Sequence, residues 1–306
     1  MVYHEIRIVN GKKLNYLVYN SRKNAKWKKI SKYIGAGELK KDIIQERKEE
    51  FIIESIASIK RQFLESSQVQ EIEMLRQIYK KNIKRLSKLE FEKFEKAFFT
   101  ELTYNSNAIE GNSLSLEETS LVVNDGLVPE GKTIRELYEA KNHAKALKYI
   151  KEYKGPINEL FILKLHYIIL EGISERFAGK YRQNPVLVIG SSAKFPSAHV
   201  VPQLMGNLIY WYETNKSKLH PFELAVIFSM KFVTIHPFID GNGRVSRLLM
   251  NSILQKKDYP WINVYLKQRG EYLKAVRLAN DEHYSQILGF LLRTLKENTN
   301  YFGFVE

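Results

Sequence analysis

Alternating apolar and polar positions open the chain and predict three short β-strands. These strands cover residues 3–9 (YHEIRIV), 13–19 (KLNYLVY) and 26–33 (KWKKISKY). Asn10 and Gly11 join the first two, and this dipeptide is the preferred chemistry of a two-residue hairpin turn. Gly35 and Gly37 then interrupt the pattern. The sequence therefore predicts a small β meander over residues 1–36.

The pattern changes to a helical period after Glu38. Four apolar residues recur at i, i+4, i+7 and i+11, namely Ile52, Ile56, Ile59 and Phe63. The next stretch, IEMLRQIYKKNIKRLSKLEF, continues the same kind of spacing. We therefore expect a helical stalk over residues 37–89.

Helical spacing also dominates the rest of the chain. Further helices are expected at about 92–109, 116–125, 132–152, 157–171, 201–215, 221–235, 243–256 and 268–297. One segment differs, because residues 184–202 place β-branched side chains on both sides of a Gly-Ser-Ser turn and indicate an exposed hairpin. The expected fold class is mainly all-α, with a helical domain over residues 90–306 behind the meander and the stalk.

Composition narrows the class of protein. The chain has 306 residues, of which 44% are hydrophobic and 27% charged, which is typical of a globular protein. It has no cysteine, so disulfides, thiolate catalysis and cysteine-based zinc sites are excluded. The start lacks an apolar signal core, and the longest apolar stretch is too short for a bilayer and contains Lys231. We expect a cytoplasmic protein without a membrane partner.

The positive charge is concentrated near the N-terminus. Of the net charge of +14, residues 1–41 carry +9, from 11 lysines and arginines against two glutamates. The predicted meander also contains aromatic side chains, namely Tyr16, Tyr19, Trp27 and Tyr33. Such a surface could bind nucleic acid through phosphates and stacking, or could dock a protein or remain a solvated basic face. Residues 1–36 are therefore a candidate docking module of open specificity.

The stretch IHPFIDGNGRVSRLLMN contains groups that neither a helix interior nor a plain loop favours. Apolar residues recur at helical spacing after Gly243, so Gly241 and Asn242 belong to a turn that opens a helix. Free amides at such an N-terminus bind anions, and glycines allow close approach. Arg244 and Arg247 stand at i, i+3, where each planar guanidinium can bind a phosphate.

Two further groups belong to the same stretch. Asp240 immediately precedes the turn, and a carboxylate there suits an Mg²⁺ ion that bridges phosphates. His236 stands where Pro237 ends the preceding helix, and it can serve as a general base. The lysine pattern of Walker-type NTPases is absent. The stretch thus predicts a polyphosphate cradle with a base beside it.

A structural alternative explains each of these features separately, as a helix boundary, surface arginines and a core histidine. The chain supplies its own comparison, since HPFELAV at 220–226 repeats His-Pro-Phe without the turn or the arginines. We expect His220 only to begin a helix, and the ordered set within 236–247 to be functional. His143 and His166 are expected to pack between helices, and no zinc site is expected.

The twelve residues HPFIDGNGRVSR resemble the Fic-family signature H-P-F-x-[DE]-G-N-G-R-x-x-R at every specified position. The resemblance covers about residues 90–295 and implies a helical bundle with a β-hairpin flap at about 184–202. It also implies transfer of AMP from ATP to a Ser, Thr or Tyr hydroxyl of a protein. In the flap, Val186, Val188 and Ile189 would pair with an extended target segment, although a plain structural hairpin remains the alternative.

The resemblance implies a role for each residue of the signature. His236 would deprotonate the target hydroxyl, and Asp240 would hold Mg²⁺ against the α- and β-phosphates of ATP. The phosphate ligands would be Asn242 with the amides of Gly241 and Gly243 for the α-phosphate, Arg244 for the β-phosphate and Arg247 for the γ-phosphate. Tyr272 and Asn280 would contact the adenine, whereas Leu273 departs from relatives that carry a second tyrosine there.

A second motif, SNAIEGN, lies more than a hundred residues upstream. Ser106 and Glu110 share one helix face near the predicted end of the helix at 92–111, where a carboxylate meets the negative end of the helix dipole. That placement suggests a cationic partner, although an exposed glutamate tolerating a small cost is the alternative. The motif resembles the Fic inhibitory motif [ST]-x-x-x-E-[GN], which implies that Glu110 pairs with Arg247 and restrains the enzyme.

Three functions follow from these observations. The first is a protein adenylyltransferase that is inhibited by its own Glu110. The second is an enzyme of the opposite sense, which removes AMP with a water positioned by Glu110. The third is a regulator that binds nucleic acid or a partner and keeps a vestigial Fic core, and the intact signature speaks against it. A homo-oligomer is compatible with all three.

Overall fold

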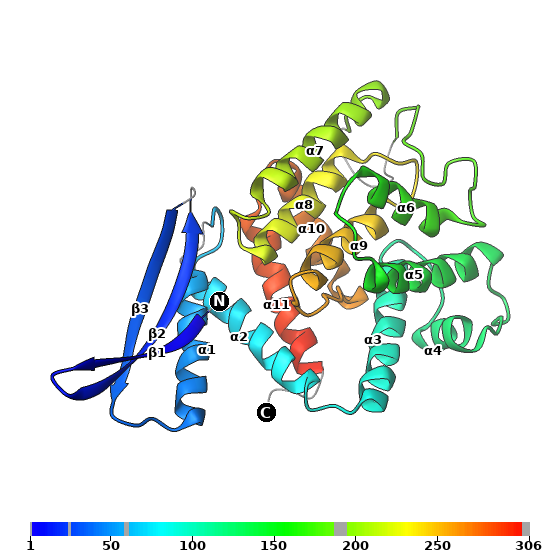
Figure 1. Cartoon of the computed structure of the whole chain (residues 1–306). Helices are drawn as coiled ribbons and strands as arrows, with labels where there is room; N and C mark the ends of the chain where they lie inside the picture. The colour runs from blue at the N-terminus through cyan, green and yellow to red at the C-terminus, as the bar shows by residue number, and fades with distance from the viewer. Residues whose placement is uncertain (1, 24–25, 58–60, 187–194, 302–306) are drawn as a thin grey trace. The chain divides into compact units, whose positions relative to one another are not determined.

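The computed structural model describes residues 2–23, 26–57, 61–186 and 195–301 (Figure 1). The chain forms two compact units. One comprises Met1–Lys60 and Glu65–Gln77, and the other comprises Arg61–Leu64 and Ile78–Glu306. Among the described residues, none of the helices combines the length and the apolar character needed to cross a lipid bilayer.

The first unit contains the predicted β meander. Its elements are β1 (Val2–Val9), β2 (Lys12–Lys23), β3 (Lys26–Ala36) and α1 (Lys41–Ala57). The strands form an antiparallel sheet in the order β1-β2-β3. Asn10 and Gly11 have φ values of 50° and 75°, the left-handed pair that a tight hairpin requires. Val2 and Leu17 pack against Phe51 of α1, which gives the unit its own small core.

The predicted stalk is not one continuous run of helix. After α1 the chain resumes helical structure in α2 (Ser66–Ile83), and Phe63 lies outside both helices, contrary to the predicted periodicity. The physical reason is a tertiary contact, because the carboxylate of Glu223 accepts hydrogen bonds from the amides of Gln62 and Phe63 at 3.0 and 2.5 Å. Ile59 lies outside the described residues.

The second unit is mainly helical, as predicted. Its further elements are α3 (Lys88–Ala108), α4 (Leu116–Ser120), the π-helical turn η1 (Leu121–Asp125), α5 (Ile134–Glu152), α6 (Glu159–Leu170), η2 (Ala198–Val200), α7 (Val201–Asn215), α8 (Pro221–Ile235), α9 (Asn242–Gln255), η3 (Leu266–Gln268), α10 (Arg269–Asn280) and α11 (Ser285–Tyr301). Helix α8 packs against α7, α9, α10 and α11, and α9 packs against α3, α5 and α6 (Figure 1). These two central helices carry the largest share of the core, including the fully buried Phe222, Phe228 and Phe232.

One prediction in this unit needs correction, and another is tested only at one end. The helix expected at 268–297 is divided between α10 and α11, because Glu282 adopts a left-handed φ of 62°. Most of the hairpin expected at 184–202 cannot be compared with the structure, because residues 187–194, including Val188 and Ile189, lie outside the described residues. On its C-terminal side the chain is already helical in η2 and α7.

Candidate active site

The site is built around the loop that joins the two central helices. His236 ends α8 with a left-handed φ of 51°, and Gly241 precedes α9 with a φ of 78°. The side chain of Asn242, the first residue of α9, closes the loop between these two residues. It accepts a hydrogen bond from the Phe238 amide at 3.0 Å and donates one to the Phe238 carbonyl at 2.8 Å. The amides at the start of α9 are thereby held in place, and free amides at a helix N-terminus are groups that can bind an anion.

A histidine from another helix supports this loop. The ring of His166 on α6 stacks on Phe238 with a centroid distance of 3.6 Å. Its Nδ1 accepts a hydrogen bond from the Gly179 amide, so Nε2 carries the proton and donates to the Asp240 carbonyl at 3.2 Å. Burial lowers the pKa of His166 to about 4, although the Asp240 carbonyl opposes this shift. His166 is the packing residue that the sequence predicts, and it also positions the backbone of Asp240.

The loop lies in a cavity of about 400 Å³ that collects most of the predicted site residues. The residues from the sequence prediction that line it are Glu110, Val186, His236, Asp240, Gly241, Asn242, Gly243, Arg244, Arg247, Tyr272 and Asn280. They come from segments that span more than half of the chain, so the fold gathers them rather than the local sequence alone. Ser106 contacts Arg247 from the side of the cavity.

His236 is uncharged at neutral pH. Burial lowers its pKa to about 4, with Arg182 acting in the same direction and the Val233 carbonyl against it. Nδ1 lies 3.3 Å from the Val233 carbonyl and donates to it, which leaves Nε2 as the proton acceptor. A neutral imidazole with a free acceptor nitrogen at the edge of an anion site is suited to act as a general base.

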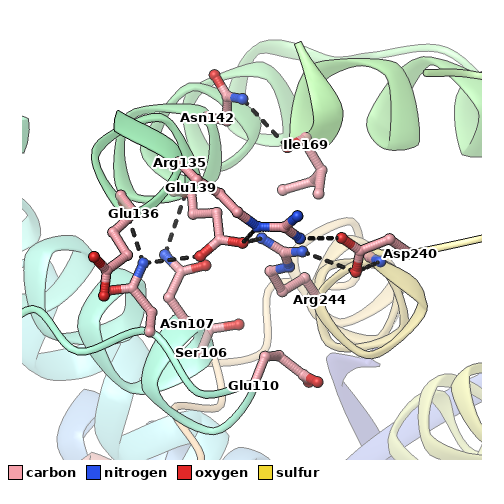
Figure 2. A network of polar contacts seen from close by, with 12 residues as sticks. Ser106, Asn107, Glu110, Arg135, Glu136, Glu139, Asn142, Ile169, Asp240 and Arg244 are labelled. Atoms are coloured by element: carbon pink, nitrogen blue, oxygen red, sulfur yellow. Dashed lines mark hydrogen bonds and ion pairs between the residues drawn. The ribbon is translucent and has the colours of Figure 1, made fainter. Parts of the chain in front are cut away.

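Asp240 is the centre of a charged network that is shown in Figure 2. Its Oδ1 accepts from the Gly241 amide at 2.5 Å and lies 3.3 Å from a guanidinium nitrogen of Arg244, and its Oδ2 lies 2.5 Å from Arg135. Burial raises the pKa of Asp240, but Arg244, the Gly241 amide and Arg135 together outweigh it and hold the pKa below its usual value. Glu139 joins the network through both arginines.

Arg244 has a buried donor group that could bind an anion. Its side chain is 3% exposed, and its Nε is buried without a hydrogen-bond partner in the described part of the chain. An unsatisfied buried donor costs free energy unless a ligand supplies an acceptor. Because this donor stands beside the amides of α9, a phosphate oxygen is the acceptor that fits.

Arg247 is paired with the second predicted motif. Its guanidinium lies 2.8 Å from Oε1 of Glu110, and it donates to the hydroxyl and the carbonyl of Ser106 at 3.1 and 2.7 Å. Glu110 lies just beyond the C-terminus of α3, in the turn that follows Ile109. A Cβ added to Gly243 would collide with the Glu110 carboxylate, so this carboxylate occupies the space directly above the first turn of α9.

The predicted adenine contacts, Tyr272 and Asn280, line the same cavity. Tyr272 is 4% exposed, and its ring lies 6.0 Å from the Arg247 guanidinium. Burial raises the pKa of its hydroxyl. The Oδ1 of Asn280 already accepts a hydrogen bond from the Thr234 hydroxyl at 2.9 Å, so its amide nitrogen is the group that remains for a ligand.

The site offers few ligands to a divalent cation. Within the described residues no group of three or more His, Cys, Asp or Glu side chains could hold a metal ion. Two carboxylates line the cavity near the start of α9: Glu110, which is paired with Arg247, and Asp240, whose side chain is 40% exposed. Mg²⁺ is commonly held by one or two carboxylates together with substrate phosphates and waters. The site therefore fits an Mg²⁺ ion that arrives with a phosphate ligand.

The helical bundle, the left-handed corner before α9 and the helix N-terminus beside His236 together resemble a Fic-type fold and site. Residues 156–254 match the Fic/DOC family. This matched region is a Fic domain, and it covers about a third of the chain. The region matched includes the whole of the loop between α8 and α9.

Part of the chain is similar in sequence to known proteins. The protein adenylyltransferase Fic of Drosophila virilis is 36% identical over 191 residues, which cover 61% of this chain and 39% of that protein. The Drosophila mojavensis protein of the same name is 35% identical over 193 residues. The chain spans about two fifths of the length of these curated relatives.

Solved structures show the same fold. A Fic-domain-containing signaling protein from Bacteroides thetaiotaomicron has a TM-score of 0.69 and 27% identity, and the match covers 76% of this chain and 96% of that one. Fic-1 from C. elegans has a TM-score of 0.67 and 25% identity, covering 77% and 71%. The fold neighbours therefore extend well beyond the residues that match the family.

Proposed function

We propose that this chain transfers AMP from ATP to a hydroxyl side chain of a protein. The observation that carries the proposal is that one cavity is lined by a neutral His236, by the start of α9 and by Arg244, whose Nε has no hydrogen-bond partner among the described residues. The relatives named as protein adenylyltransferases support the same chemistry. A helix N-terminus and two arginines suit a triphosphate, and the histidine suits activation of a hydroxyl.

The proposed reaction is an in-line displacement at the α-phosphorus. The oxygen of the target hydroxyl attacks the α-phosphorus while its proton passes to Nε2 of His236. The bond from the α-phosphorus to the bridging oxygen breaks, and pyrophosphate leaves with the electron pair. The amide of Gly243 and the guanidinium of Arg244 stabilise the charge on the phosphates, and Arg247 orients the γ-phosphate, while the Gly241 amide holds the Asp240 carboxylate.

Asp240 is the residue that would hold Mg²⁺. When bound, the ion would neutralise phosphate charge beside the anion site. The role of Asp240 in this proposal is to offer one carboxylate at the start of α9, held in place from behind by His166 through the Asp240 carbonyl.

We further propose that Glu110 inhibits the chain. The ion pair with Arg247 and the position of the carboxylate above Gly243 support this idea, because both withhold groups that a γ-phosphate needs. The adenine would contact Tyr272 and Asn280, and Val186 at the edge of the cavity would lie beside the target segment.

Labelled ATP tests the reaction itself. The full-length chain carrying Glu110→Gly should become labelled by ATP that is radioactive at the α-phosphate and should remain unlabelled by ATP that is radioactive at the γ-phosphate. Label from the γ-phosphate would indicate phosphoryl transfer and contradict the proposal. Loss of pre-formed label on the wild-type chain, but not on the variant, would favour the reverse reaction, in which Glu110 positions water.

The basic N-terminal sheet supports a separate docking function. Arg7 lies over the Tyr16 ring at 4.1 Å and pairs with Glu5, whereas Tyr33 remains 50% exposed. If residues 1–36 bind nucleic acid, retention of the full chain on RNA or DNA should fall steeply as salt is raised, and deletion of these residues should abolish it. Absence of retention at low salt would leave protein docking as the function of this sheet.

A further inference from the structure

Arg135 occupies the position from which a cation would approach Asp240. Its terminal nitrogen lies 2.5 Å from Oδ2, and the other carboxylate oxygen, Oδ1, is already engaged by the Gly241 amide and by Arg244. Every oxygen of Asp240 therefore has a donor. A carboxylate must give at least one oxygen to a divalent cation in order to bind it. Although Oδ2 keeps a second lone pair, a cation bound there would stand beside the positive charge of Arg135, so the cation and the guanidinium compete for this oxygen.

Glu139 holds both arginines in this arrangement. Its Oε1 lies 3.2 Å from Nε of Arg135 and 3.2 Å from a terminal nitrogen of Arg244, and its Oε2 accepts from the side chain of Asn112 at 2.9 Å. The guanidinium of Arg135 thus spans two carboxylates at once, as Figure 2 shows. Such a planar fork holds its position better than a lysine ammonium would.

The two arginines differ in their freedom to move. The side chain of Arg244 is 3% exposed, whereas that of Arg135 is 58% exposed and projects from the first turn of α5. Moving Arg135 into solvent costs little desolvation, because it keeps its charge hydrated, whereas displacing Arg244 would leave a buried charge without partners. Arg135 is therefore the donor that can leave.

We propose that Arg135 is an internal counter-ion that competes with divalent cations for Asp240. Metal entry is an exchange, in which the cation takes the place of the guanidinium and Arg135 turns to solvent on its Glu139 tether. The free chain then binds metal weakly, and binding depends on phosphates that bring their own negative charge. The inference rests on the proposed function only in assigning Asp240 to the metal; the competition itself is a property of the free chain.

The experiment measures binding of Mn²⁺ alone to the full-length chain without nucleotide, from the loss of the free-ion EPR signal. Arg135→Gln should bind Mn²⁺ more tightly than wild type, by roughly two- to fivefold, the effect expected for removing one partly exposed charge pair. Arg135→Lys should fall between the two. Asp240→Asn should remove the binding in every background.

Arg293 supplies the matched control. Its side chain is 60% exposed and forms an ion pair with Glu271, so Arg293→Gln removes an equally exposed charge away from Asp240. Equal Mn²⁺ affinity in Arg135→Gln and wild type, or an equal gain in Arg293→Gln, would overturn the competition. A gain confined to Arg135 variants supports it even if no AMP transfer is found, so this outcome is separate from that of the proposed function.

Discussion

Replacing Glu110 with glycine should raise self-labelling by ATP by roughly 5- to 150-fold, the range of a typical coupling free energy between two sites. The wild-type carboxylate lies 2.8 Å from Arg247 and fills the space above Gly243. Without this carboxylate, the Arg247 guanidinium and the space above Gly243 both become available to the γ-phosphate. The measurement is the initial rate of label incorporation at saturating ATP and Mg²⁺, with Arg247→Ala in the same background as the opposing change.

The double variant should lose at least about tenfold relative to Glu110→Gly, because γ-phosphate orientation is lost either way. Glu110→Gln separates the two causes, since it keeps the volume above Gly243 and removes the charge. Breaking the pair should also lower the melting temperature by roughly 1–4 °C, because Arg247 is buried. A merely structural glutamate would produce the loss of stability without any gain in rate, and equal rates for wild type and Glu110→Gly would end the self-inhibition proposal.

Removing the imidazole of His236 should reduce AMP transfer on the order of 10²- to 10⁴-fold while leaving ATP affinity nearly unchanged. The phosphates are held by other groups, so only the proton transfer is lost. His236 adopts a left-handed φ of 51°, a conformation that alanine tolerates poorly and asparagine more readily. His236→Asn should therefore accompany His236→Ala, because it removes the base with less strain on the backbone. Transfer at a near wild-type rate in both variants would exclude His236 from the reaction.

The pH profile gives this prediction a second readout. Since the pKa of His236 is lowered to about 4, the neutral base is present at all pH values well above 4 and is lost as the pH falls through that value. In the Glu110→Gly background, the histidine-dependent acid limb of the rate should therefore lie near pH 4 rather than near 6.5. A midpoint near 6.5 would mean that the histidine is not buried in the active form.

Helix boundaries could be predicted where the local sequence marks them. The helices expected at 201–215 and 221–235 match α7 and α8, because Pro202, Pro221 and the His236-Pro237 pair punctuate them. The division between α10 and α11 has no glycine or proline to announce it. It coincides with contacts from α8, in which Thr234 binds Asn280 and Lys231 binds Glu282. Such a break depends on a partner helix that local periodicity does not describe.

In the candidate site, too, some residues could be predicted from the local sequence and others depend on tertiary packing. The residues of HPFIDGNGRVSR are neighbours in sequence, so their spacing alone could suggest a shared site. Glu110 could be predicted from the separate motif SNAIEGN. Arg135 could not be predicted, since it occupies an ordinary surface position on α5 and meets Asp240 only through the packing of α5 on α9. The support that His166 gives to the loop was hidden for the same reason, as a buried histidine on an apolar helix carries no local signal.

The overlap between Glu110 and the space above Gly243 also limits how this sequence can change over time. A side chain at 243 would force the carboxylate aside, so a substitution there would alter restraint and nucleotide fit in one step. Conversely, a small residue at 110 would open room that position 243 could then fill. The two positions are epistatic: the acceptable residues at one depend on the residue present at the other. Selection acting on regulation at one position is therefore also selection on the shape of the phosphate site.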